Sequence, residues 1–500
     1  MLVTLKKIPL IAYLLVPLGI AGTIFMSWLT PFGVGIYVDT LYYVSSARNL
    51  IAGIGLGRVT GLGNFKPITA FPPFYPYVLA FFHLLKVPEL TTARWISIFA
   101  FGLTIIMVGL IIYQRTQSHF FSVLSAILIL LSNPVLHIYS WAMTEALYIL
   151  MTLVSLCFLA IYLQTPLRRW LVFTAIFTSL TVLTRYIGVS LVGAFLIVIL
   201  LNRQLSWRNR IKDLVVFLPI SLLPILLYML RNWLVSETLT HRVFRWHPIS
   251  SMNIGFLLKT ISSWGLMPQR LMVGRETLAS AGIILCLAVI SLFWLLRSLP
   301  KLGIAPRQEF ALLLSAWFYT GLLIISLLFL DAAIRLENRI LLPLYVLIML
   351  LIAIGLALLW QKKTWLYRLP VMLICLWLAY FSVTRVNGAI IDLRSDGQGY
   401  ASQQWQNSPT AEFVRLHDPS LIYTNDLTAI YFLAGKDSVA IPNAKSTEAD
   451  LTNMRANLTR PNSYMVIFGP LTAEFASQEQ LTQDLSLVGS FIDGKVYQLH

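Results

Sequence analysis

Charge is scarce in this chain, and acidic charge is the scarcest kind. Of 500 residues only 21 are Asp or Glu, against 37 Lys or Arg. Charged residues make up 12% of the sequence, whereas soluble domains contain roughly 25%. Hydrophobic residues reach 58%. Such a composition excludes a set of ordinary soluble domains and indicates that most of the chain lies in a lipid bilayer.

Several familiar motifs are also absent. The sequence has no GxxxxGK[ST] loop, no GxGxxG turn after a strand, no HExxH helix and no Cys/His cluster, which argues against ATP-driven transport and zinc chemistry. Its three cysteines, Cys157, Cys286 and Cys375, lie in apolar runs without CxxC spacing, as packing residues do. The net charge of +16 comes from short basic clusters between apolar runs. These clusters favour contact with membrane lipid and not with nucleic acid.

The apolar runs predict about eleven membrane-spanning helices of roughly 15 to 22 residues. We place them near 8–30, 91–113, 119–137, 145–163, 170–184, 186–201, 213–231, 278–297, 309–330, 340–360 and 369–385. With the N-terminus in the cytoplasm, successive basic clusters from Arg115 to Arg368 all fall on the inner side, as the positive-inside bias requires. The start of the chain predicts a retained anchor in the plasma (inner) membrane, because its apolar run has no clear cleavage site.

Two large segments fall on the outer side in this topology. Residues 31–90 form a first outer loop, in which 40–52 and 77–87 predict helices that lie in the membrane interface. From about residue 386 the pattern changes to short helices and strands, with strands expected at 421–424 and 464–468. We therefore predict a transmembrane domain at 1–385 and a small extracytoplasmic α/β domain at 386–500. The fold class is an all-α polytopic membrane protein with this α/β domain attached.

Two acidic residues at the outer ends of helices are candidates for chemistry. Asp39 lies just past the first apolar span, and Glu145 begins a later span. A carboxylate held at the membrane surface can accept a proton from an incoming hydroxyl or amine, or bind a cation. The alternative is structural, since an acid near a helix N-terminus also stabilises the helix. Local pattern alone leaves both readings open.

Arginines near the outer side form a second group of candidates. Arg185 interrupts a long hydrophobic stretch, so it is either the exposed tip of a hairpin or the partner of an anion. The segment 331–339 is densely charged and contains Arg335, Glu337 and Arg339. It is either an ordinary charged loop or a phosphate clamp, because the forked donors of arginine suit phosphate oxygens. Arg231 opens the large outer loop beside an aromatic residue and could meet a lipid phosphate too.

Short motifs in the membrane part resemble those of one family. They are Asp39 to Gly55, with the spacing D..YY..SARNL..G.G, FPPFYPY at 71–77, Thr144-Glu145, LTRYIG at 183–188, Arg231-Asn232-Trp233 and RILLP at 339–343. Their order resembles the integral-membrane GT-C glycosyltransferases that use polyprenyl-phosphate sugars. The similar branch holds the protein O-mannosyltransferases, the lipid A aminoarabinose transferases and the bacterial lipopolysaccharide-core transferases of the RgtA/B/C/D type.

The resemblance implies a cavity formed by the first outer loop, with Asp39 as the essential acid and Glu145 as a second acid. It implies donor-phosphate binding by Arg339, with Arg185, Arg231 and Arg335 as further candidates. Substrate-binding candidates in the same motifs are Tyr42, Tyr43, Arg48, Tyr75 and Glu337. The chain departs from the aminoarabinose transferases at Pro72-Pro73, where they place a lysine before proline, and it lacks the tryptophan-rich aspartate motif of oligosaccharyltransferases.

We therefore expect a glycosyltransferase that moves a sugar from a polyprenyl-phosphate donor to a lipid, glycan or protein acceptor on the outer face, with inversion. No cofactor is required by the sequence. A divalent cation stays open, with Asp39 and Glu145 as its only candidate ligands. The alternatives are a lipid-linked glycan flippase, which should show internal repeats, and an enzyme of the O-antigen ligase or polymerase type, which would use the arginines and histidine of the outer loop 232–277.

Overall fold

Long apolar helices form the larger part of the protein. The computed structural model describes residues 10–264, 308–362 and 364–499, together with residues 282, 286, 289–291 and 294. In these residues seven helices are long and apolar enough to cross a membrane, or eight if one bent pair counts as a single span. The seven are α1 (Leu10–Leu29), α4 (Glu89–Thr116), α7 (Glu145–Gln164), α10 (Trp207–Ser236), α14 (Gln308–Phe329), α15 (Asn338–Trp360) and α16 (Trp365–Ser395).

Shorter helices complete the bundle. The bent pair is α5 (His119–Leu130) and α6 (Asn133–Tyr139), which meet at an angle of 56°. The hydrophobic hairpin consists of α8 (Arg168–Thr184), η1 (Tyr186–Gly188) and α9 (Val189–Leu200). Each expected span that falls on described residues coincides with one of these helices or pairs. Most of the expected span at 278–297 lies outside the described residues, as do the first nine residues and the basic residues Arg297, Lys301 and Arg307.

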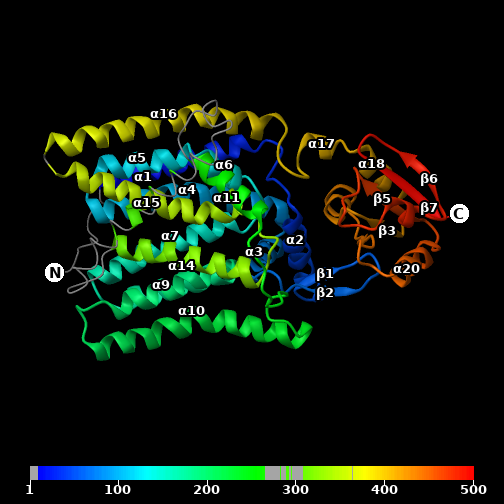
Figure 1. Ribbon diagram of the computed structural model, residues 1–500, viewed down its shortest axis with the longest axis horizontal. Helices are drawn as coiled ribbons and strands as arrows, with labels where there is room; N and C mark the ends of the chain where they lie inside the picture. Colours follow the sequence, from blue (N-terminus) through cyan, green and yellow to red (C-terminus); the bar gives the residue numbers. More distant parts are fainter. Residues whose placement is uncertain are drawn as a thin grey trace.

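Residues 31–90, which we call the first outer segment after the predicted topology, fold against one end of the bundle. This segment contains α2 (Val38–Ile51), the two-stranded antiparallel pair β1 (Gly57–Val59) and β2 (Phe65–Pro67), and α3 (Phe74–Leu84). Both helices are too short to span a bilayer. Figure 1 shows this segment between the helix bundle and the C-terminal domain. The large loop that follows α10 includes α11 (Ser251–Trp264).

The C-terminal residues form a five-stranded mixed sheet in the order β4-β3-β5-β7-β6. Its strands are β3 (Leu421–Thr424), β4 (Val439–Ala440), β5 (Ser463–Phe468), β6 (Leu485–Ser490) and β7 (Gly494–Leu499). The helices are α17 (Gln403–Gln406), α18 (Pro409–His417), α19 (Leu427–Ala429), η3 (Ile430–Ala434), α20 (Glu448–Leu458) and α21 (Gln478–Thr482). Strands β3 and β5 were expected from the sequence, whereas the β6–β7 hairpin was not.

Alternate residues of the sheet build two separate cores. Tyr423 and Met465 belong to one hydrophobic cluster, while Ile422 and Val466 belong to the other. This alternation follows from the two-residue period of a strand and shows that both faces of the sheet are covered. The small α/β domain expected at the C-terminus is therefore present. Its boundary at 385/386 stays a prediction, since α16 continues without a break to Ser395.

Candidate active site

A cavity of about 430 Å³ lies at the end of the bundle that carries the first outer segment. Residues from α2, the α8–η1 junction, α14 and the segment before α15 line it. Six of the residues predicted from the sequence share this lining: Asp39, Tyr43, Arg185, Arg335, Glu337 and Arg339. They come from segments up to 300 positions apart in the chain. The fold therefore concentrates the candidates at one place.

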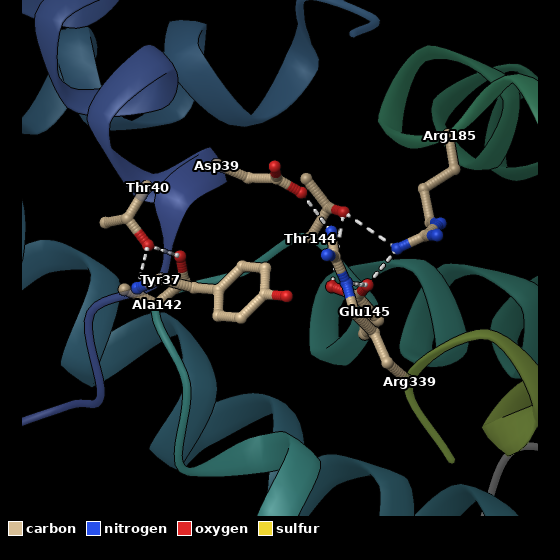
Figure 2. A network of polar contacts seen from close by, with 8 residues as sticks. All are labelled: Tyr37, Asp39, Thr40, Ala142, Thr144, Glu145, Arg185 and Arg339. Atoms are coloured by element: carbon tan, nitrogen blue, oxygen red, sulfur yellow. Dashed lines mark hydrogen bonds and ion pairs between the residues drawn. The ribbon is translucent and has the colours of Figure 1, made fainter. Parts of the chain in front are cut away.

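Arg339 joins the two predicted acids. It lies in the first turn of α15, where its Nη2 donates to Oδ2 of Asp39 and its Nε donates to Oε1 of Glu145 at 2.8 Å. Figure 2 shows the guanidinium between the two carboxylates. Asp39 has its side chain 17% exposed, whereas that of Glu145 is fully buried. Of the two acids, Asp39 is therefore the one that a substrate can reach.

Glu145 is neutralised by two arginines. Arg185 Nη1 donates to the same Oε1 that receives Arg339, and it also donates to the hydroxyl of Thr144 at 3.3 Å. A carboxylate without exposure is stable as an anion only when it is paired and hydrogen-bonded. Glu145 thus holds both guanidinium groups in place beside the cavity. Arg185 follows the last residue of α8, pairs with a carboxylate and has a side chain only 18% exposed, so the geometry fits an anion partner and not an exposed hairpin tip.

The backbone around Asp39 is fixed by neighbouring contacts. Asp39 lies in the first turn of α2. The hydroxyl of Thr40 accepts from the amide of Tyr37 at 3.0 Å and donates to the carbonyl oxygen of Ala142 at 3.0 Å (Figure 2). The Tyr37 ring also packs 5.0 Å from the Arg339 guanidinium, as a cation–π pair does. These contacts attach the N-terminal turn of α2 to the segment before Glu145.

The charged side chains of the cavity lining are mostly basic. Arg335 lies over the ring of Phe256 at 5.7 Å, and Arg242 pairs with Asp331 at 3.2 Å. With Arg185 and Arg339 they make four arginines in the lining, beside the carboxylates of Asp39 and Glu337. Glu145 and Asp331 do not line the cavity but pair with three of the four arginines. The N–H groups that these carboxylates leave unused suit an anionic ligand, since a guanidinium fork can donate to phosphate or carboxylate oxygens.

Four predicted residues have other contacts. Tyr42 packs against Phe71, and the Tyr75 ring is buried against Tyr43. Arg48 pairs with Glu89 at 3.0 Å.

Arg231 is the fourth of these residues. It donates to the backbone carbonyl oxygens of Leu56 and Ile68 at 3.0 and 2.9 Å. None of the four lines the cavity. Arg231 instead holds the first outer segment on α10.

Three cavity residues were missed by sequence reasoning. Tyr37 adjoins Asp39 in the sequence, so proximity was its only signal. Tyr319 lies in the apolar run of α14, where an aromatic residue gives no sign of a site. Arg242 was considered only for the ligase alternative. Burial raises the pKa of the Tyr43 phenol well above the ordinary value, so this predicted residue is a neutral phenol.

A shared cation between the two acids has little support from this geometry. Arg339 occupies the position between Asp39 and Glu145 that such an ion would need. No cluster of three or more His, Cys, Asp or Glu side chains suited to a metal was found among the described residues. We therefore derive no step of the chemistry through a metal.

Comparison with known proteins assigns the fold. Residues 69–240 match the family described as dolichyl-phosphate-mannose-protein mannosyltransferase. The structure is similar to ArnT from Cupriavidus metallidurans bound to undecaprenyl phosphate, with a TM-score of 0.58 and 13% identity over 97% of both chains. The chain has the GT-C glycosyltransferase fold.

Two further GT-C structures are similar to the chain. The archaeal oligosaccharyltransferase AglB from Archaeoglobus fulgidus, in complex with an inhibitory peptide and a dolichol-phosphate, gives a TM-score of 0.54 at 12% identity. The match covers 91% of this chain and 69% of AglB. Arabinofuranosyltransferase AftD from Mycobacteria gives 0.54 at 16% identity over 97% of this chain and 41% of AftD. No curated protein sequence matches significantly.

The GT-C fold and the family match confirm the class expected from the motifs. They support a multi-pass membrane protein and an enzyme that is a polyprenyl-phosphate-dependent glycosyltransferase. A lipid-linked donor and an acceptor are supported in general terms. The sugar, the acceptor and the residues that act on them belong to the proposal that follows.

Proposed function

We propose that this enzyme transfers a sugar from a polyprenyl-phosphate donor to an acceptor hydroxyl or amine in the cavity beside α2. The bond between the anomeric carbon and the phosphate oxygen breaks, and a bond from the acceptor to the same carbon forms. The acceptor proton goes to Asp39, and polyprenyl phosphate leaves with its negative charge. A single displacement of this kind inverts the anomeric carbon. The acceptor is a lipid, a glycan or a protein.

The observation that carries this proposal is the way in which the two carboxylate oxygens of Asp39 are placed. Arg339 engages Oδ2 and keeps the carboxylate beside the cavity, while Oδ1 has no hydrogen-bond partner among the described residues. A positioned general base needs a lone pair within reach of the acceptor proton, which Oδ1 supplies. The structural reading of Asp39 as a helix cap explains neither its cavity position nor its pairing across 300 residues.

The arginines supply the second requirement of the reaction. Polyprenyl phosphate is a good leaving group already held in the bilayer, so the protein must mainly orient it and stabilise its charge. Arg339 uses only Nε and Nη2 on carboxylates, which leaves N–H donors for a phosphate oxygen. We assign the same role to Arg185 and Arg335 at the cavity wall. Glu145 orients the guanidinium groups of Arg339 and Arg185.

We infer the membrane placement from the basic clusters. The inner side carries Arg115, Arg168 and Arg203 among others, so the cavity and the C-terminal domain face outward and the N-terminus faces the cytoplasm. In a bacterial host this corresponds to the inner membrane. A phosphatase reporter that folds only outside the cytoplasm, fused after the last residue, should be active. An inactive but expressed fusion would contradict this topology.

The test of the function uses purified full-length protein in nanodiscs. Radiolabelled polyprenyl-phosphate hexose, pentose and aminosugar are supplied with a membrane extract as acceptor source. Wild type should consume one of the donors, and Asp39→Asn should lower that rate by roughly 10²- to 10⁴-fold, as expected for loss of a general base. Asp213→Asn is the matched control. The carboxylate of Asp213 pairs with Arg168 at 3.2 Å, and neither residue lines the cavity.

The two variants separate chemistry from folding. Asp213→Asn should keep its rate even where its melting temperature falls. Full donor consumption by folded Asp39→Asn would remove Asp39 from the mechanism. A folded wild type that consumes none of the three donors would overturn the proposed reaction.

A further inference from the structure

The segment before Asp39 is held on both sides by backbone pairing. On one side the Gly35 amide donates to Ser140 and its carbonyl oxygen accepts from Ala142, both at 2.8 Å. On the other side the Tyr400 amide donates to the carbonyl oxygen of Ile36 at 3.2 Å. The second contact comes from the segment that connects α16 to the C-terminal domain. The N-terminal end of α2 is therefore attached to the C-terminal part of the chain.

Gly399 allows the backbone of residues 399–400 to approach the backbone of Ile36 closely. A Cβ atom there would lie 2.1 Å from the carbonyl oxygen of Ile36 and 2.6 Å from the Trp141 ring. Its φ of +55° also lies in the left-handed region that side chains rarely adopt. Any other residue at 399 must displace either the Ile36 backbone or Trp141.

The C-terminal end of α2 has a second attachment. Arg48, in the last turn, donates to both oxygens of Glu89 at 3.0 and 3.1 Å and to the hydroxyl of Tyr431 at 3.0 Å. Tyr431 belongs to η3 of the C-terminal domain. Its ring and that of Phe432 pack on a hydrophobic cluster that includes Tyr43. The C-terminal domain thus contacts the C-terminal end of α2, and the segment that leads into this domain contacts the residues just before the N-terminal end of α2.

We propose that the C-terminal domain acts as a clamp on α2 and thereby positions Asp39, with Gly399 and Tyr431 as the positioning residues. The inference rests on the role proposed above for Asp39. A 14-residue helix is marginal on its own, so α2 depends on such contacts to keep one orientation. A displacement of about 1 Å in a reacting group can cost roughly 100-fold in rate.

The experiment compares two glycine substitutions in the full chain. Gly399→Ala should push against Ile36, whereas Gly469→Ala is a control with a similar φ of +59° and no atom within 4 Å of its Cβ. Hydrogen exchange of the α2 amides is measured by mass spectrometry, along with kcat and KM for the donor that wild type consumes. Gly399→Ala should speed exchange in α2 and lower kcat by roughly 10- to 100-fold with little change in KM. Gly469→Ala should leave these quantities unchanged.

A second variant covers the case in which Gly399→Ala does not fold. Tyr431→Phe keeps the ring and removes the hydroxyl that Arg48 contacts. Tyr431→Phe should also speed hydrogen exchange in α2 and lower kcat, by less than Gly399→Ala does. Tyr423→Phe is its control, because it removes a hydrogen bond to Asn457 within the C-terminal domain and makes no contact with α2.

Hydrogen exchange separates failure of the clamp from failure of the proposed reaction. Faster exchange in α2 supports the clamp even if no donor is consumed. Unchanged exchange in folded Gly399→Ala and Tyr431→Phe would overturn it. Faster exchange with an unchanged kcat would overturn the positioning of Asp39, since the helix would then loosen without consequence for turnover.

Discussion

Arginine–carboxylate pairs occur near both ends of the helix bundle, and the two ends use them differently. At one end of α4, Arg115 donates to both oxygens of Glu309, with 2.7 Å for the Nη2 contact, and neither residue lines the cavity described above. At the other end, Arg339 divides its donors between Asp39 and Glu145 at the wall of a cavity. The first pair joins two helices. The second keeps reactive groups beside a space for substrate.

The comparison teaches that pairing alone does not indicate function. Glu309 and Glu145 are both almost completely buried and both bind arginine. They differ in what lies next to the guanidinium. Arg115 contacts one carboxylate through two donors, whereas Arg339 contacts two carboxylates and faces open volume. Three predictions about arginines test this difference, and a fourth concerns a buried acid outside the bundle; the expected effects run from the largest to the smallest.

Replacing arginine by lysine at each end should give opposite results. Lysine presents one compact ammonium and cannot reach two carboxylates as the fork of Arg339 does. Arg339→Lys should lower turnover by roughly 100-fold, because Asp39 loses its orientation. Arg115→Lys should lower stability by about 1 kcal/mol and leave turnover unchanged. Donor consumption and thermal melting of both variants measure this, and equal loss of turnover in the two would erase the distinction.

Arg335 should bind phosphate more directly than Arg242, because Arg242 is already paired with Asp331. Arg335→Gln should weaken binding of undecaprenyl phosphate by roughly tenfold, the value of one charge-assisted hydrogen bond. Arg242→Gln should weaken it less. Titration of each protein in nanodiscs with undecaprenyl phosphate gives the two dissociation constants. A larger loss of affinity in Arg242→Gln than in Arg335→Gln would instead assign the phosphate site to the loop that contains Arg242.

Arg231 should behave as a structural residue although its motif predicts phosphate binding. Arg231→Gln removes the hydrogen bonds to the carbonyl oxygens of Leu56 and Ile68 and should cost about 1 to 3 kcal/mol of stability. The KM for the donor should change little. Melting temperature and KM are measured together, with Arg335→Gln as the contrasting variant. A rise in KM without a loss of stability would restore the phosphate-binding role.

Asp426 gives the smallest effect and lies in the C-terminal domain. Burial raises the pKa of its carboxyl above the ordinary value, although Tyr400 and the amides of Thr428 and Ala429 oppose the shift. The folded state then holds the proton more tightly than the unfolded state, so stability falls as pH rises from about 4 through the raised pKa. Asp426→Asn, which keeps a capping side chain, should show a flatter dependence of melting temperature on pH. A steeper fall in the variant would contradict this sign.

Much of the architecture could be predicted from the sequence, because burial in lipid imposes a strong local pattern. Apolar runs of span length located the helices of the bundle, and the break at Arg185 marked the hairpin between α8 and α9. Short apolar runs located β3 and β5, which are buried along their whole length. The β6–β7 hairpin was missed since β6 is an edge strand with no buried residue and no such run.

Composition and motif order determined the membrane class and the position of most helices, and they selected Asp39, Glu145 and Arg339 as candidate site residues. These properties follow from local sequence, where scarce charge in an apolar chain is informative. Only the tertiary structure decided which charges meet. It paired Arg339 with both acids, turned Arg48 and Arg231 to structural contacts, and brought Gly399 against Ile36. Such contacts join residues hundreds of positions apart, and their geometry depends on how the helices pack, which no local pattern encodes.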